Sequence, residues 1–129
     1  MIVARILVVE DSAFLSKSIR TFLEEEGHDV VAVAGDGFEG VSSFKELKPD
    51  LTLLDITMPG MDGRSCLREI LEHDGSARVL MVSAIQSRQA ILDCLSAGAR
   101  GYVEKPLRFN DEDFRADFRA SIAEALNHD

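Results

Sequence analysis

Polar side chains able to do chemistry directly follow four of the five apolar runs in the sequence. These side chains are Glu10, Asp11 and Ser12 after the first run, Asp55 after the third, Ser83 after the fourth and Lys105 after the fifth. Taken singly, an Asp or Ser in such a place most often caps the following helix. A lone Lys there is most often solvated. Their combination is what predicts a shared site.

The three carboxylates predict a metal site. If the first and third runs are neighbouring strands, Glu10, Asp11 and Asp55 share one crevice. Three carboxylates cannot all ionise at close range without compensating positive charge. A hard divalent cation supplies that charge, and oxygen ligands with open water positions suit Mg²⁺ best. We therefore expect Mg²⁺ as the cofactor.

The remaining polar groups favour phosphoryl transfer. The Lys105 ammonium and the Ser83 hydroxyl add donors to the same crevice. A cation, an ammonium, a hydroxyl and loop N–H groups together suit the equatorial oxygens of a phosphoryl group in transfer. One carboxylate can act as the nucleophile and become an acyl phosphate. The pattern alone does not choose which carboxylate this is.

The apolar runs predict the elements that position these groups. They span residues 6–9, 30–33, 51–54, 79–82 and, more weakly, 101–103. Most are continuous rather than alternating, which is typical of parallel strands covered on both faces. In open parallel sheets, ligands bind in the crevice outside the carboxyl ends of the strands. The polar residues above follow the strands at that end.

Helical periodicity fills the intervals between the runs. Apolar stripes with helical spacing fall at residues 15–23, 41–47, 66–71, 91–95 and 114–126. The segment 34–37 after the second run is interpreted as a plain turn and helix cap. Alternating strands and helices predict one α/β domain with a central parallel sheet.

Composition excludes several classes of function. The chain has 129 residues with 14 Lys and Arg against 23 Asp and Glu, a net charge of −9. That balance argues against direct binding to nucleic acid or an anionic membrane. No signal-peptide pattern and no apolar stretch of the roughly 20 residues needed for a span is found, so we expect a cytoplasmic protein without membrane insertion. Cys66 and Cys94 are expected to be reduced core thiols.

In its motifs the sequence resembles the receiver domain of bacterial two-component response regulators. The matching motifs are Glu10-Asp11 after the first run, the segment LLDITMPGMDG at 53–63, Val82-Ser83-Ala84, Ala97-Gly98-Ala99 and Lys105-Pro106. Their order is more specific than any one motif, and the match runs from about Arg5 to the end. The resemblance implies a flavodoxin-like, doubly wound sheet of five parallel strands in the order 2-1-3-4-5 with five helices. It also implies a cis Lys105-Pro106 bond.

The resemblance also implies a role for each site residue. Asp55 is then the phosphoacceptor, and Mg²⁺ is held by Glu10, Asp11, Asp55 and the backbone carbonyl of Thr57, with Glu10 acting partly through water. Lys105 pairs with the phosphoryl group, and the backbone of Thr57 and Ala84 binds it. Ser83 is the switch hydroxyl, Tyr102 is the coupled aromatic, and Ile85 partly shields the acyl phosphate. The segment 107–114 departs from the family pattern because it is longer and more acidic.

The leading interpretation is a stand-alone regulator, with residues 1–129 forming a single receiver domain and no output domain. It accepts a phosphoryl group from a histidine kinase or phosphotransfer protein, catalyses its own phosphorylation and slow dephosphorylation, and binds a downstream protein in a chemotaxis-type pathway. The face made by the fourth helix, fifth strand and fifth helix carries the signal. The alternatives are a receiver excised from a larger regulator or hybrid kinase, a phosphorelay intermediate and a phosphate sink.

Three other classes fit less well. A flavodoxin-like electron carrier needs a first loop that accepts the FMN phosphate, which the charges of Glu10 and Asp11 repel. A phosphatase of the dehalogenase type needs a second acid two residues after its nucleophile, where this chain has Thr57. An adaptor with an inactive site is expected to lack Asp11, Asp55 or Lys105, and all three are present.

Overall fold

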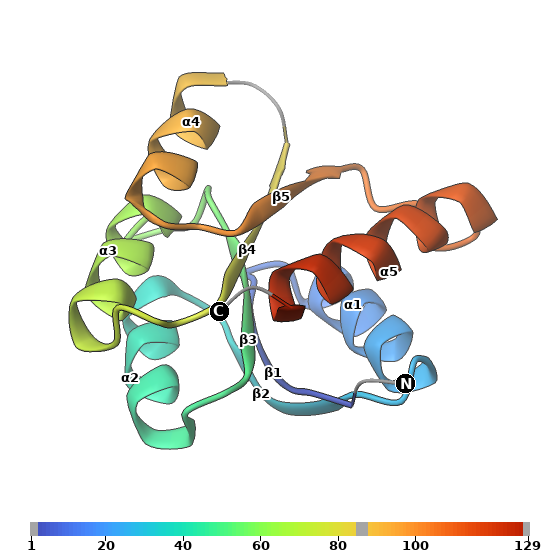
Figure 1. Cartoon of the computed structure of the whole chain (residues 1–129), viewed down its shortest axis with the longest axis horizontal. Helices are drawn as coiled ribbons and strands as arrows, with labels where there is room; N and C mark the ends of the chain where they lie inside the picture. The colour runs from blue at the N-terminus through green and yellow to red at the C-terminus, as the bar shows by residue number, and fades with distance from the viewer. Residues whose placement is uncertain (1–2, 85–87, 128–129) are drawn as a thin grey trace.

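The computed structural model describes residues 3–84 and 88–127, and within them five strands alternate with five helices (Figure 1). The strands are β1 (Arg5–Val9), β2 (Asp29–Ala34), β3 (Leu51–Asp55), β4 (Val79–Ala84) and β5 (Gly101–Lys105). The helices are α1 (Ala13–Glu25), α2 (Gly37–Leu47), α3 (Gly63–His73), α4 (Arg88–Ala97) and α5 (Glu112–Asn127). In this part of the chain, no helix is long and apolar enough to cross a membrane.

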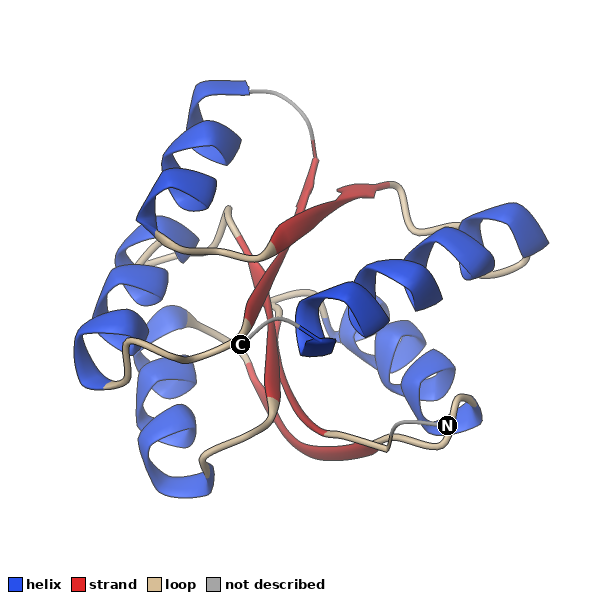
Figure 2. Ribbon diagram, in the orientation of Figure 1, coloured by secondary structure: helices blue, strands red, loops and turns tan. Residues whose placement is uncertain are grey.

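The strands form one parallel sheet in the order β2-β1-β3-β4-β5, which confirms the predicted fold class and topology. Helices α1 and α5 cover one face, and α2, α3 and α4 cover the other (Figure 2). Strands β1 and β3 are neighbours, with Val9 opposite Leu54 at their carboxyl ends. This pairing is the condition under which the three carboxylates share a crevice.

Strands β4 and β5 each run two residues beyond the apolar segments of the sequence. Ser83 pairs with Glu104 and Ala84 with Lys105, so the parallel ladder continues into the polar residues. Backbone pairing does not depend on side-chain polarity, which is why the hydrophobic pattern ended these strands too early. Ser83 and Lys105 are therefore held by the sheet itself.

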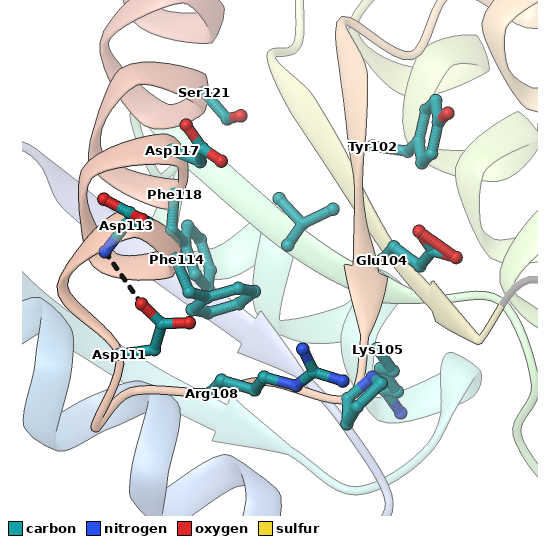
Figure 3. A pocket seen from close by; sticks show the side chains of 12 residues that line it. Tyr102, Glu104, Lys105, Arg108, Asp111, Asp113, Phe114, Asp117, Phe118 and Ser121 are labelled. Carbon is teal, nitrogen blue, oxygen red and sulfur yellow. Dashed lines mark hydrogen bonds between the residues drawn. The ribbon is translucent and has the colours of Figure 1, made fainter.

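The sheet has two edge strands, β2 and β5, because the described strands pair these two on one side only. The first half of α5 and the loop before it lie alongside β5, on the face of the sheet that α1 and α5 cover. A pocket of about 550 Å³ lies between β5 and these residues (Figure 3).

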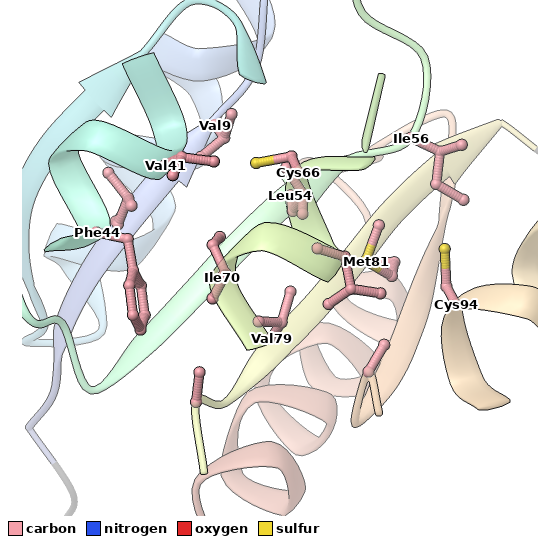
Figure 4. Close-up of a cluster of buried hydrophobic side chains, with 14 of the residues drawn as sticks. Val9, Val41, Phe44, Leu54, Ile56, Cys66, Ile70, Val79, Met81 and Cys94 are labelled. Carbon is pink, nitrogen blue, oxygen red and sulfur yellow. The ribbon is translucent and has the colours of Figure 1, made fainter. Parts of the chain in front are cut away.

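Apolar side chains pack on both faces of the sheet. On the side of α2, α3 and α4, Val9, Leu54 and Met81 contact residues of the helices, including Ile70 (Figure 4). Cys66 and Cys94 lie in this cluster as free, buried thiols, which agrees with the prediction that both are core residues. Burial raises the pKa of the Cys66 thiol to about 12, so this group is unreactive at neutral pH.

Aromatic stacking closes the other face of the sheet. Phe22 of α1 and Phe118 of α5 stack with ring centroids 5.3 Å apart. Phe109, in the loop before α5, stacks on both at 5.0 and 5.6 Å. We did not predict Phe109 as a core residue. This ring anchors the loop before α5 to the core.

Side-chain caps begin the helices that follow the first three strands. Ser12 accepts a hydrogen bond from the Leu15 N–H at 3.2 Å, and Asp36 and Asp62 cap α2 and α3 in the same way. A capping oxygen satisfies one of the free N–H groups of a first helical turn. Since Ser12 and Asp62 do this work, the carboxylates of Asp11 and Asp55 are left for other chemistry.

The start of α3 approaches the end of β3 closely at Gly63. The Gly63 N–H donates to the Ile56 carbonyl at 2.7 Å. A Cβ atom at Gly63 would lie 2.2 Å from the backbone oxygen of Asp55 and 2.6 Å from the Cα of Ile56. Only a glycine allows this contact, which fixes the loop that carries Asp55.

We expect Gly63→Ala to lower the free energy of unfolding by about 2 kcal/mol or more, because the added methyl group meets backbone that cannot rotate away. Urea denaturation followed by circular dichroism measures the loss. Gly75→Ala is the matched control, since the nearest atom to its Cβ is 3.9 Å away. Equal stabilities for the two variants would show that the close approach is not a constraint.

Candidate functional site

Three carboxylates meet at the carboxyl ends of β1 and β3. Glu10 and Asp11 directly follow β1, and Asp55 is the last residue of β3. One carboxylate oxygen from each residue lies within 4.8 Å of the others. The structure thus brings together the three acids that the sequence pattern predicts to share a crevice.

A single lysine reaches this acidic group from the end of β5. The Nζ atom of Lys105 lies 3.0 Å from Oε1 of Glu10 and 3.3 Å from Oδ2 of Asp55. Burial on its own lowers the pKa of Lys105, but the hydrogen bond to Glu10 and the charges of both acids outweigh it, and the pKa is raised. Lys105 therefore stays protonated and partly offsets the two buried carboxylates.

Glu10 and Asp55 are buried, at 3% and 4% exposure, whereas Asp11 is exposed. Burial raises the pKa of Asp55, against the charge of Lys105 and a hydrogen bond from the Thr57 N–H. Burial also raises the pKa of Glu10, against a hydrogen bond from the Ser12 N–H and the lysine. In both acids burial outweighs the hydrogen bonds and the ammonium, so the folded site favours the neutral form of each carboxyl group.

The loop after β3 supplies a backbone donor to Asp55. The Thr57 N–H donates to Oδ1 of Asp55 at 3.3 Å, while Lys105 faces the other carboxylate oxygen. Both oxygens of the Asp55 carboxylate are therefore held in place by a donor. Thr57 is exposed, and it comes two residues after Asp55 on the rim of the crevice.

The Ser83 hydroxyl does not donate its hydrogen bond to Asp55. Ser83 is buried, and its Oγ donates to the backbone carbonyl of Ala84 at 2.9 Å. Ala84 is exposed at the end of β4, which lies between β3 and β5. Ser83 therefore lies in the strand next to that of Asp55, and its hydroxyl already donates to a neighbouring backbone carbonyl. Ile85 lies outside the described residues.

Tyr102 sits on β5, three residues before Lys105. Its side chain is 42% exposed and lies on the side of the strand away from α5 (Figure 3). It is paired in the sheet with Met81, two residues before Ser83. The Lys105-Pro106 peptide bond is cis, as the resemblance implied.

Two supporting residues were not predicted as part of the site. The Ser12 N–H donates to Oε2 of Glu10 at 3.1 Å, so the residue that caps α1 also orients an acid. Gly63 shapes the loop that holds Asp55. Gly63 is part of the 53–63 motif, so the sequence marked this position. The structural reason for a glycine there is a backbone contact, which no side-chain pattern could predict.

The residues fit a divalent cation of the Mg²⁺ type. The donor set consists of carboxylate oxygens, which hard cations prefer. Two of the three acids are buried with raised pKa values, and one ammonium faces three carboxylates. Asp11 is the exposed member, so it faces the solvent from which an ion enters.

Comparisons with known proteins agree with one another. The family model of the response regulator receiver domain matches residues 6–116. The chain is 41% identical to the chemotaxis protein CheY of Bacillus subtilis, over 95% of this chain and 94% of that protein. It is 46% identical over 78% of its length to a protein-glutamate methylesterase/protein-glutamine glutaminase of Geobacter metallireducens, where the match spans 29% of the relative.

The fold gives the same answer as the sequence comparisons. The crystal structure of a CheX-CheY-BeF3-Mg²⁺ complex from Borrelia burgdorferi matches with a TM-score of 0.87 at 37% identity. The match covers 96% of this chain and 90% of that one. Sequence, fold and site geometry therefore point to one family.

We expect Asp55→Asn to raise the free energy of unfolding near neutral pH, by about 1 kcal/mol, because it removes one buried charge from a crowded site. The folded state raises the pKa of Asp55, so it favours the neutral acid. The cost of the charged form is present at neutral pH and disappears as the pH falls through that raised pKa. The advantage of the variant should shrink accordingly in urea denaturation on the acid side.

Excess Mg²⁺ should make the wild type more stable than Asp55→Asn, because an ion that binds only the folded state stabilises it. The wild type then gains more stability than Asp55→Asn. Glu46→Gln, on the exposed side of α2, is the control for a general charge effect. A wild type that gains no stability from Mg²⁺ would contradict the assignment of a metal site.

Proposed function

The chain belongs to the family of response regulator receiver domains and is a signalling switch of the two-component type, and from this premise we propose that Asp55 accepts a phosphoryl group from a histidine kinase or phosphotransfer protein. One observation carries the proposal. Asp55 closes the central strand β3, buried beside two further acids, with the Lys105 ammonium 3.3 Å from its carboxylate. Oxygen donors, a cation and a fixed nucleophile are what phosphoryl transfer requires.

Position in the sheet favours Asp55 over the other two acids as the nucleophile. Glu10 and Asp55 have the same kinds of contact, each with a backbone N–H on one oxygen and the Lys105 ammonium on the other. Asp11 is exposed. Asp55 differs from both because it is the last residue of the central strand β3, whereas Glu10 and Asp11 lie in the loop after β1.

The reaction balances with the donor's own leaving group. A carboxylate oxygen of Asp55 forms a bond to phosphorus while the P–N bond of the donor's phosphohistidine breaks, and its electron pair returns to the imidazole. The reverse of activation is hydrolysis, in which water attacks phosphorus and releases inorganic phosphate and the free carboxylate. The protein thus promotes its own phosphorylation and slow dephosphorylation.

Glu10, Asp11, Asp55 and the backbone carbonyl of Thr57 would hold Mg²⁺. When bound, the ion offsets the charge of the incoming phosphoryl group. The N–H groups of Thr57 and Ala84 donate to phosphoryl oxygens. Lys105 exchanges part of its present contact with Asp55 for one of those oxygens.

The signal leaves the site through Ser83 and Tyr102. The Ser83 hydroxyl now donates to the Ala84 carbonyl, and its rotation to a phosphoryl oxygen draws the end of β4 inward. Tyr102 then turns from its exposed position toward the space vacated beside β5. Two such states need differ by only a few kcal/mol for a phosphoryl group to select one. The face of α4, β5 and α5 then changes its affinity for a downstream protein.

The relatives suggest the setting. The Bacillus subtilis relative is a chemotaxis protein, and the Borrelia burgdorferi relative is complexed with CheX in the presence of Mg²⁺. We assign this chain to a chemotaxis-type pathway in the cytoplasm, with protein partners and no direct contact with nucleic acid. The Geobacter metallireducens relative, matched over 29% of its length, supports the alternative of a receiver within a longer regulator. Phosphorelay and phosphate-sink roles use the same chemistry.

Asp55 should be the sole phosphorylation site. Acetyl phosphate with Mg²⁺ labels the wild type, whereas EDTA stops the reaction because the incoming dianion then meets three uncompensated carboxylates. Asp55→Asn abolishes the label, and Asp11→Ala weakens Mg²⁺ binding more than Glu10→Ala does. Mapping of the labile adduct by mass spectrometry after borohydride trapping reads the site. Label on Asp11, or full labelling of Asp55→Asn, would overturn the assignment.

Ser83→Ala should accept the phosphoryl group at Asp55 and yet fail to move Tyr102. The hydroxyl is the link between the phosphoryl oxygen and the end of β4, while nucleophile and metal ligands stay intact. Chemical shifts of the Tyr102 ring with and without acetyl phosphate measure the response. Ser83→Thr keeps the hydroxyl and should retain it. A wild-type response in Ser83→Ala would exclude the hydroxyl as the coupling group.

A further inference from the structure

The loop between β3 and α3, which we call the β3–α3 loop, carries the backbone that faces Asp55. The Thr57 N–H donates to Oδ1 of Asp55 at 3.3 Å. The two ends of the loop are tied together, because the Gly63 N–H donates to the Ile56 carbonyl at 2.7 Å. The proposed metal site also uses the Thr57 carbonyl as a ligand. The geometry of the acidic site therefore depends on how this loop is held.

The middle of the β3–α3 loop is held by packing alone. Within the described residues 3–84 and 88–127, Met58, Pro59, Gly60 and Met61 make no hydrogen bond. Ordering a backbone segment costs conformational entropy, which hydrogen bonds or packing must offset. Segments with few such contacts are the ones that open most readily. The side chains that contact these four residues therefore decide how well Thr57 is placed.

Buried side chains fasten the loop from the side of the core. Met58 lies in the apolar cluster beneath α2, α3 and α4, together with Ile56, and Met61 packs against that cluster while partly buried. Pro59 and Gly60 are exposed on the outer side of the loop. A second element must cover this outer side if the loop is to be held from both directions.

The first turn of α2 lies against the outer side of the loop. Gly37 begins α2, and a Cβ atom there would lie 2.6 Å from the backbone oxygen of Met61. The Cys66 thiol of α3 donates to the Gly37 carbonyl at 3.6 Å. The start of α2 is thus fixed against both the loop and α3, which also fixes the residue that follows Gly37.

That residue is Phe38, and its ring covers Gly60. The atoms nearest to the position of a Cβ at Gly60 are two ring carbons of Phe38, at 3.5 and 3.9 Å. The side chain of Phe38 is 64% exposed and belongs to neither of the two buried clusters. A ring exposed to this extent contributes little to the core, so its contact with the loop is the feature to explain.

Helix α2 does not need the ring of Phe38. Asp36 caps the helix by accepting a hydrogen bond from the Glu39 N–H at 2.9 Å, and Val41 and Phe44 bury its apolar side. Alanine also has a higher helix propensity than phenylalanine. Loss of the ring therefore leaves α2 and the core in place and removes only the cover of the β3–α3 loop.

We propose that Phe38 is a positioning residue of the acidic site. Its ring holds the β3–α3 loop from the solvent side while Met58 holds it from the core side, so that Thr57 keeps its backbone in place beside Asp55. The inference deepens the proposed function, on which its metal and phosphoryl-transfer readouts rest. The contact between Thr57 and Asp55 in the metal-free protein does not rest on that function.

Phe38→Ala tests the support in the full, metal-free chain. We expect the amide resonance of Thr57 to shift and the amide order parameters of residues 57–61 to fall, because the loop loses its outer contact. Thermal unfolding should stay close to that of the wild type, and Phe38→Tyr, which keeps the ring, should restore the resonance and the order. A Thr57 amide and loop order unchanged in Phe38→Ala would overturn the proposal.

Phe14→Ala is the matched control. Phe14 and Phe38 are each the second residue of their helix, and Phe14 is 78% exposed, but α1 covers the opposite face of the sheet. The control removes the same ring from the surface and should leave the Thr57 amide and the loop unchanged. Equal effects of the two variants would reflect the loss of any surface phenylalanine and would refute the specific role of Phe38.

The dependence of labelling on Mg²⁺ tests the metal ligand. The Mg²⁺ concentration that gives half-maximal labelling by acetyl phosphate should rise about tenfold in Phe38→Ala, as expected when the support of a metal ligand is removed. The rate at saturating Mg²⁺ should stay near that of the wild type, because binding of the ion orders the loop again. An unchanged half-maximal concentration, or an equal loss of rate at every Mg²⁺ concentration, would contradict a role in placing the ligand.

The two readouts separate this inference from the proposed function. A wild type that neither binds Mg²⁺ nor accepts a phosphoryl group would count against the proposed function alone. The Thr57 amide and the order of the loop in the metal-free variants would still decide whether Phe38 positions the backbone beside Asp55.

Discussion

The structure depends on placing two carboxylates and one ammonium where water screens them poorly. Glu10 and Asp55 are buried at the ends of neighbouring strands, with Asp11 at the mouth of the crevice. Burial alone favours their neutral forms, and Lys105 offsets only part of the charge. A site of this kind is unstable unless a rigid scaffold imposes it, and it binds positive charge readily. The proposed function rests on that imbalance.

The parallel sheet is the scaffold that imposes it. Two apolar clusters, one on each face, anchor β1, β3 and β4. The helices that cover these strands fix the positions of the loops between strand and helix. Gly63 lets the start of α3 lie against the backbone of Asp55, and Ser12 caps α1 while its N–H orients Glu10. The free energy gained by packing the two apolar clusters thus maintains an arrangement of buried charges that is unfavourable by itself. Active sites commonly trade stability for function in this way.

The sequence was sufficient to predict the fold and the proximity of Glu10, Asp11, Asp55 and Lys105, but not the contacts of these side chains. Continuous apolar runs predicted the parallel strands, and the order of the strands came from the resemblance rather than from periodicity. The ends of β4 and β5 were missed because backbone pairing continues through Ser83 and Lys105. The stacking of Phe109 on Phe22 and Phe118 was missed because residues 107–111 are polar apart from this ring and Leu107. The present partner of the Ser83 hydroxyl is a backbone carbonyl, which no side-chain pattern encodes.

Lys105 links the acidic site to the edge strand β5, and its contacts would make a bound metal and the lysine interdependent. Its ammonium lies 3.0 Å from the carboxylate of Glu10 and 3.3 Å from that of Asp55. If it moves toward a phosphoryl oxygen, Glu10 keeps only the Ser12 N–H as a partner while still buried. An unpaired buried carboxylate is costly. A cation held by the acids would remove that cost, so under the proposed function the lysine would move at little cost only with the metal bound. The two positive charges would therefore depend on each other, with the metal on the acids after β1 and β3 and the ammonium at the end of β5.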